Sequence, residues 1–237
     1  MGYKFYWPVL WEYRETLLQG FLLTIQLFFI CSALSLILGM IFGIFGTSRR
    51  LWLRLIAEAY VEFNRNIPMI VQLFFLYFAF GMDAFFASVV GLSIHQSAYM
   101  AEVIRSGIQS LPRGQFEAGL STGLPVTGVL RYIILPQALV IVIPPLITQF
   151  LEVLKNSSIA MTITVTELTF QTQQIESFTF RGFEAATAVT LIYLFLSLII
   201  AAVVNGFRWW ITTRRLTLSE LRGREHRLAI GTLTPKE

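Results

Sequence analysis

EAGLSTGLPVTGVLRYIILPQA, residues 117–138, begins with small and polar residues and ends in an apolar run. Gly123 and Pro125 separate the two halves, because glycine commonly ends a helix and proline cannot continue one. Upstream, Pro112 is suited to the first turn of a helix. The pattern predicts a helix of about a dozen residues that ends at Gly123 and leads into a hydrophobic segment.

The rest of the chain is strongly apolar. Of its 237 residues, 55% are hydrophobic and 14% are charged, whereas soluble domains carry about 25% charged residues. About 20 apolar helical residues cross a bilayer. We therefore predict an all-α integral membrane fold with five transmembrane helices in one domain, residues 20–210. The predicted spans are 20–46, 55–81, 84–105, 131–153 and 184–209.

The connecting segments set the predicted orientation. Lysine and arginine favour the cytoplasmic side of a membrane, and most of the arginines fall there if the N-terminus is outside. The segment 106–130 is then a cytoplasmic loop, 155–181 an external loop and 211–237 a basic cytoplasmic tail. Basic residues beside membrane ends attract anionic lipid, so the positive net charge does not indicate nucleic-acid binding.

The N-terminal segment, residues 1–19, has the composition of a membrane interface. Its opening, MGYKFYWPVLWEY, lacks the order of charged, apolar and small residues that marks a cleaved signal peptide. Tyrosine and tryptophan gather at membrane interfaces. A single cysteine, Cys31, excludes an intrachain disulfide, and two separated histidines do not indicate a metal site.

Three acid–base pairs within or beside the spans need an explanation, because a charge at the bilayer centre costs about 2.5–3.5 kcal/mol. Their members are three residues apart and share a helical face. The pairs are Glu62 with Arg65, Glu102 with Arg105, and Glu152 with Lys155. Either they neutralise each other at the membrane boundary, or they line a hydrated path.

Small residues and prolines predict how two spans pack. Gly39 and Gly43 form a GxxxG pattern that permits close approach of another helix. Pro144 and Pro145 are expected to interrupt the fourth span, which therefore faces the protein interior.

The helix predicted between Pro112 and Gly123 carries a narrow apolar ridge, formed by Phe116 and Leu120 and continued by Leu124. It could rest on the bilayer surface. Its apolar area is small for that role, and a groove in a protein partner is the preferred receptor.

The same stretch resembles the EAA loop of permease subunits in ATP-binding-cassette importers. The family pattern is EAA, three residues, Gly, nine residues, Ile, any residue and Leu-Pro, with Gly119 here in place of the second alanine. Further segments resemble the polar amino acid branch, with histidine, glutamine and glutamate permeases. They are VEFNRNIPMIVQLFFLYF (61–78), SAYMAEVIRSGIQSLPRGQFEAG (97–119) and LKNSSIAMTITVTELTFQTQQI (154–175).

The resemblance implies a type I importer permease of the bacterial inner membrane. It implies a second permease subunit, identical or homologous, a cytoplasmic ATP-binding subunit and an extracytoplasmic solute-binding protein. ATP and Mg would be bound by that partner, with no cofactor or enzyme activity in this chain, whose three lysines follow no glycine-rich loop. The residues expected to couple to the ATPase are Arg113, Gly114, Phe116, Glu117, Ala118, Gly119, Leu120, Gly123 and Leu124.

The expected substrate is a polar amino acid: glutamate, aspartate or glutamine, with basic amino acids or another polar solute as alternatives. A zwitterion needs paired donors and acceptors in a dehydrated cavity. The candidate pathway residues are Asn64, Arg65, Glu102, Arg105, Asn156, Ser157, Ser158, Thr162 and Thr164. The same groups could be helix caps and loop turns. A passive channel would not explain the docking helix, and a membrane enzyme would need clustered catalytic groups that the sequence does not show.

Overall fold

The computed structural model describes residues 3–231, and all regular secondary structure in that range is helical. Two segments, η1 and η2, are π-helices and η3 is a 3₁₀-helix. In chain order the elements are α1 (Pro8–Glu12), α2 (Arg14–Gly46), α3 (Leu51–Asn66), α4 (Met69–Phe74), η1 (Phe75–Ala79), α5 (Ala84–Gln109), α6 (Arg113–Ser121), α7 (Val126–Val129), η2 (Leu130–Ile134), α8 (Leu135–Asn156), η3 (Ser157–Ile163), α9 (Leu168–Thr179) and α10 (Gly182–Gly231).

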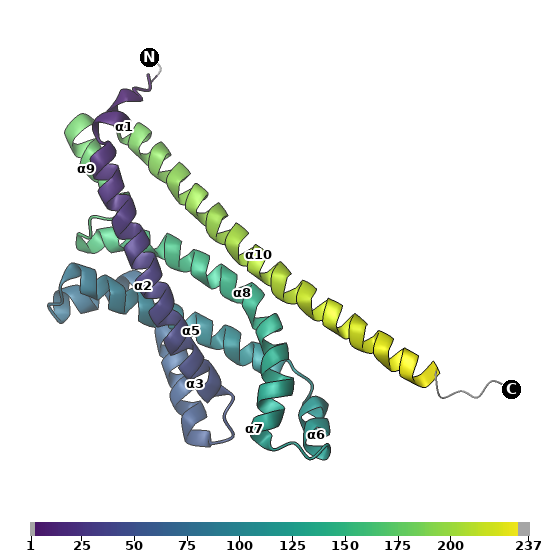
Figure 1. The fold of residues 1–237 in the computed structure, drawn as a ribbon. Coiled ribbons are helices and arrows are strands. Elements are labelled where there is room, and N and C mark those ends of the chain that lie inside the picture. The colour runs from purple at the N-terminus through teal and green to yellow at the C-terminus, as the bar shows by residue number, and fades with distance from the viewer. Residues whose placement is uncertain (1–2, 232–237) are drawn as a thin grey trace.

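The elements divide between two ends of the molecule. Figure 1 shows α1, α9 and the start of α10 together at the end that carries the N-terminus. At the opposite end lie α6, α7 and the turn between α2 and α3. The central part is built on α2 and α5, which pack along each other. The helix expected to dock a partner thus lies far from the N-terminal segment.

Glycines allow α2 and α5 to approach closely. A Cβ atom at Gly39 would lie 2.7 Å from Cβ of Met100, and one at Gly43 would lie 2.9 Å from the carbonyl oxygen of Ala101. Real Cβ atoms do not come so near a backbone oxygen. The GxxxG pattern is confirmed as the contact surface of α2 for α5.

Three helical runs are long and apolar enough to cross a membrane: Arg14–Gly46, Val126–Ile163 and Gly182–Gly206. They correspond to the first, fourth and fifth predicted spans. α5 covers the predicted third span, 84–105, but it is less apolar than these three and largely buried inside the protein. Five spans and the direction of the termini therefore stay predictions.

The predicted second span, 55–81, is not one helix. α3 ends at Asn66, Ile67 has an extended backbone (φ −100°, ψ 126°), and α4 begins at Met69. The cause is Pro68, because proline disfavours a helical conformation at the residue before it and has no N–H to donate. The apolar piece that remains, Met69–Ala79, is too short to cross a bilayer alone.

The segment 155–181, expected to be an external loop, is largely helical and packed in its central part, while its side of the membrane stays a prediction. η3 and α9 occupy most of it, and Leu168 and Ile175 are fully buried. The buried Glu167 caps α9 by accepting the N–H groups of Thr169 at 2.8 Å and Phe170 at 2.9 Å. Burial raises the pKa of Glu167, and these hydrogen bonds oppose that rise.

Pro144 and Pro145 do not interrupt the fourth span, since α8 continues through both from Leu135 to Asn156. Each proline lacks one backbone donor, and α8 packs against α5 and α10. α10 also extends beyond its predicted end at 209 and continues as helix to Gly231, through most of the predicted basic tail. Residues 232–237 of that tail lie outside the described part of the chain.

Candidate functional site

The helix predicted from the opening stretch is present as α6, with nine residues from Arg113 to Ser121. Pro112 precedes it, as expected of a helix start. Gly123 has φ +82°, a left-handed conformation that glycine adopts without strain. Pro125 follows and precedes the short helix α7. Pro112 and Gly123 thus mark the two ends of α6.

One face of α6 packs on the same chain through a glycine. Gly119 is buried, and a Cβ atom there would lie 2.9 Å from both Cγ1 of Val129 and Cδ1 of Ile133. The departure from the second alanine of the EAA pattern therefore has a packing reason, since these two side chains fill the space. α6 sits directly on the α7–η2 segment as a result.

The opposite face of α6 is exposed. Glu117, Ala118, Leu120 and Ser121 are exposed. Among the residues that the structure describes, no ion pair includes the carboxylate of Glu117. A free acid beside an exposed leucine offers both charge and apolar area to another molecule.

The predicted ridge is divided between these two faces. Phe116 is half-buried, with the guanidinium carbon of Arg49 5.5 Å from the centre of its ring. Leu120 is exposed and Leu124 is half-buried. Arg49 lies in the turn between α2 and α3, so α6 contacts that turn as well as η2.

A glutamine on α8 joins α6 to the fourth span. Nε2 of Gln137 donates to Oε1 of Gln115 on α6 and, at 2.8 Å, to the carbonyl oxygen of Ile133 in η2. Sequence reasoning missed this pair, because its members are 22 residues apart and neither belongs to the EAA pattern. The bridge connects the exposed helix to the first turn of α8.

Four predicted pathway residues come together beside α5. The guanidinium of Arg65 lies 5.3 Å from the ring centre of Tyr99 on α5, and Tyr99 is three residues from Glu102. Glu102 accepts two bonds from Arg105, at 2.6 and 3.0 Å. Asn64 is buried and its side chain bonds Tyr60 in its own helix. Glu102 and Arg105 thus form an ion pair, while Arg65 stacks on an aromatic ring.

The other predicted pathway residues lie at the end of α8 and along η3. Three hydroxyls donate to carbonyl oxygens three residues earlier: Ser157 to Leu154, Ser158 to Lys155 and Thr162 to Ile159. These bonds support the alternative that such residues are local caps. Asn156 ends α8, and Thr164 takes a left-handed conformation with φ 68° after η3.

The family described as "Binding-protein-dependent transport system inner membrane component" matches residues 35–214. The chain belongs to this family. The match includes α6, both π-helices and every predicted pathway residue. The protein is therefore an inner membrane permease component, with its apolar helices in the bilayer.

Related permeases match most of the chain. It is 38% identical over 202 residues to the "Probable glutamine ABC transporter permease protein GlnM" of Bacillus subtilis, which covers 83% of this chain and 94% of that protein. It is 31% identical over 205 residues to the "Glutamate/aspartate import permease protein GltJ" of Escherichia coli, with 79% and 83% covered. The solved "amino acid ABC transporter with histidines" has a TM-score of 0.80 at 32% identity, covering 87% and 99%.

Buried polar residues of the permease that the sequence reasoning did not select lie on α5. Nε2 of Gln96 donates to Oε1 of Gln149 on α8 at 2.6 Å, and both are within predicted spans. The buried His95 has no partner for Nδ1 among the described residues. Polar residues inside a membrane are costly and often functional, so their presence in 84–105 was the available signal.

An open hollow of about 450 Å³ lies between α2, the start of α5 and the loop after η3. Gln26, Asp83, Thr164 and Thr166 supply its polar lining. Thr164 is the predicted pathway residue that contributes to it. Asp83 also caps α5 by accepting the N–H of Phe85 at 2.9 Å, which fixes its carboxylate.

Proposed function

We propose that this chain is the permease subunit of an ATP-driven importer of polar amino acids. It crosses the membrane five times, with the N-terminus outside, and α6 docks on a cytoplasmic ATP-binding subunit. The observation that carries the proposal is the combination in α6 of an exposed face with a free Glu117 and an opposite face tied to α8. Such a helix can receive a force from a partner and pass it to a membrane helix.

The substrate class rests on the relatives. GlnM is named for glutamine and GltJ for glutamate and aspartate, so one of these three amino acids is the first choice. Basic amino acids are the second, because a solved structure similar over 87% of the chain is named with histidines. Uptake of labelled glutamine, competed with glutamate, aspartate, arginine and histidine in turn, would decide between them.

The partners follow from the same assignment. A second permease subunit completes the pathway, a solute-binding protein delivers the substrate from outside, and ATP with Mg is bound and hydrolysed by the ATP-binding subunit. Closure of the ATPase would displace α6, and because α6 leads through η2 into α8, the wall of the pathway would tilt. Rigid-body motion of this kind converts a local event into alternating access.

Labelling tests the orientation and the docking together. In a Cys31→Ser background, Ser121→Cys should react with an impermeant maleimide only in inverted membrane vesicles, and Trp11→Cys only in intact cells. A cross-linker on Ser121→Cys should capture the ATP-binding subunit. Reaction of Ser121→Cys from outside, or a purified assembly that transports without any ATPase, would overturn the proposal.

Gln137→Leu is expected to weaken coupling between ATP hydrolysis and uptake. The change removes the hydrogen bonds from Gln137 on α8 to Gln115 and Ile133 and puts an apolar side chain of similar size in its place. A net hydrogen bond contributes about 1 kcal/mol, so the ratio of substrate transported to ATP hydrolysed should fall roughly fivefold. Reconstituted vesicles permit both rates to be measured on one preparation.

The matched control for that change is Gln173→Leu, which alters an exposed glutamine on α9. It should leave the ratio unchanged. Gln115→Leu should reproduce the effect of Gln137→Leu, and the double variant should be no worse than either alone. Equal decreases of uptake and hydrolysis in Gln137→Leu would show that the bridge is only structural.

A further inference from the structure

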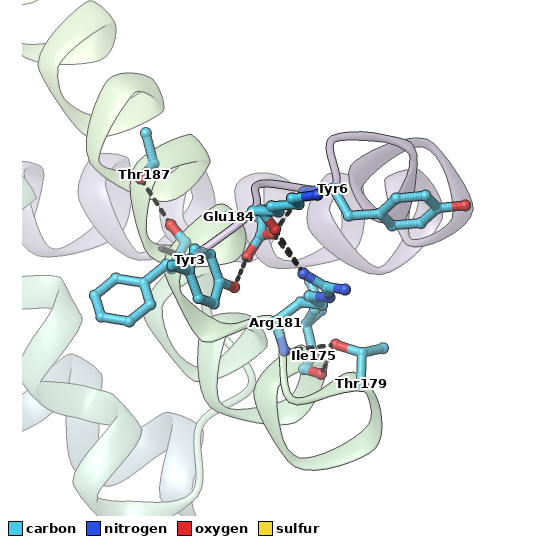
Figure 2. A network of polar contacts seen from close by, with 9 residues as sticks. Tyr3, Tyr6, Ile175, Thr179, Arg181, Glu184 and Thr187 are labelled. Atoms are coloured by element: carbon cyan, nitrogen blue, oxygen red, sulfur yellow. Dashed lines mark hydrogen bonds and ion pairs between the residues drawn. The ribbon is translucent and has the colours of Figure 1, made fainter. Parts of the chain in front are cut away.

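A buried carboxylate holds the N-terminal segment against the start of α10. Glu184 is fully buried and accepts the hydroxyl of Tyr3 and, at 2.7 Å, the N–H of Tyr6. Arg181 lies 3.5 Å from the same carboxylate and donates to the carbonyl oxygen of Lys4 at 2.9 Å. Figure 2 shows Tyr3, Tyr6 and Arg181 converging on Glu184. Two segments about 180 residues apart are thereby fixed together.

This attachment assembles a continuous row of aromatic rings. Phe183 of α10 lies 5.2 Å from Tyr3, Tyr3 lies 5.3 Å from Phe5, and Phe5 stacks on Trp7 at 5.2 Å, all measured between ring centres. The rings are not buried: their residues are between 48% and 67% exposed. Phe180, which follows the last residue of α9, is 88% exposed. A row of this length outside the core requires something to cover it.

The chemistry of the row fits the headgroup region of a bilayer. Tyrosine and tryptophan have an apolar body and a polar edge, which suit the boundary between lipid tails and water. Arg181 supplies a cation beside the row, with its guanidinium carbon 5.9 Å from the centre of the Tyr3 ring, and lipid phosphates attract such groups.

The position of the row points to the same occupant. It adjoins the first turns of α2 and α10, two of the helices long and apolar enough to cross the membrane. On α10 the exposed apolar surface continues with Leu191, Leu194 and Phe195. A surface continuous with lipid-facing helices has lipid as its neighbour.

We propose that the row Phe183–Tyr3–Phe5–Trp7 lies in the lipid headgroup region, and that Glu184 is the positioning residue that holds it there. Without Glu184 the N-terminal segment loses two hydrogen bonds to α10, and Arg181, which donates to the carbonyl oxygen of Lys4, loses its ionic partner. The segment would then separate from Phe183, and the row would be divided. The bilayer contact is thus built by residues from both parts of the chain.

Tryptophan fluorescence in lipid nanodiscs tests the proposal. Trp7 is kept and the other four tryptophans, Trp11, Trp52, Trp209 and Trp210, are replaced by phenylalanine. Lipids brominated near the headgroup should quench Trp7 more than lipids brominated near the chain end, and aqueous acrylamide should quench it weakly. Strong acrylamide quenching without lipid quenching would overturn the proposal. Trp7 shielded only after addition of a solute-binding protein would also overturn it, and would identify a receptor surface.

Two variants test the role of Glu184 without reference to transport. Glu184→Ala should lower quenching by the shallow brominated lipid about twofold, because an interfacial tryptophan is released to water. Glu12→Ala, which removes an exposed acid from the neighbouring α1, should leave it unchanged. Tyr3→Phe keeps the ring and removes one hydrogen bond to Glu184, so it should give a smaller decrease, with the helix content by circular dichroism unchanged. Unchanged quenching in both Glu184→Ala and Tyr3→Phe would show that the row needs no such support.

Discussion

Glu117→Lys is expected to abolish substrate-stimulated ATP hydrolysis and to reduce uptake about tenfold or more, because reversal of a charge at a docked interface costs several kcal/mol. The carboxylate is exposed on the outward face of α6 and has no ion-pair partner within the described chain. The fold should therefore tolerate the change. The measurement is hydrolysis and uptake by the purified assembly with its solute-binding protein, before and after substrate is added.

Two companion variants make the result specific. Glu117→Gln removes the charge without reversing it and should give an intermediate loss. Thr127→Lys adds a positive charge at an exposed position of α7, outside α6, and should be close to wild type. Undiminished hydrolysis and uptake in Glu117→Lys would remove α6 from the mechanism.

Gly43→Leu should prevent α2 from packing on α5. Even the first atom of a side chain at this position would lie 2.9 Å from the carbonyl oxygen of Ala101 and from Cβ of Ile104. A backbone oxygen cannot rotate aside as a side chain can. Overpacking commonly costs about 1–3 kcal/mol, and each kcal/mol lowers the unfolding midpoint of a chain this long by roughly 2–4 °C. We expect a lower midpoint in detergent and a reduced yield of folded protein.

The matched control is Gly206→Leu in the apolar part of α10, where an added Cβ would meet no atom within 4 Å. It should leave the midpoint near that of the wild type. Gly43→Ala should be intermediate. If Gly43→Leu unfolds at the wild-type temperature, α2 and α5 do not approach as closely as described.

Local signals explain what could be predicted of α6 and the spans. Pro112, Gly123 and Pro125 act within a few residues of their own positions, so both ends of α6 could be placed from sequence. Likewise, long charge-free stretches predict membrane helices irrespective of their neighbours. Pro68 was also visible, but hydropathy over a window of about 20 residues averages across it and joins two helices into one.

What could not be predicted depends on distant partners. The polar composition of residues 155–181 suggested an external loop, yet the N–H of Leu168 donates to Thr24, 144 residues away, and α9 is packed into the protein. The Gln96–Gln149 and Gln115–Gln137 bonds likewise join separate helices. For the pathway residues, the sequence left open whether they contact substrate or cap the ends of helices. It does not show to which carbonyl oxygen a hydroxyl donates.

The break at Pro68 has a mechanical consequence. Among the described residues, the hydrogen bond that crosses it is the side-chain contact from Gln72 to the carbonyl oxygen of Asn64, at 3.1 Å. A continuous helix must break main-chain hydrogen bonds in order to bend, whereas across Ile67 the hydrogen bond between α3 and α4 is this side-chain contact alone in the described part of the chain. The break between α3 and α4 at Ile67 therefore lies two residues from Arg65, which stacks on Tyr99.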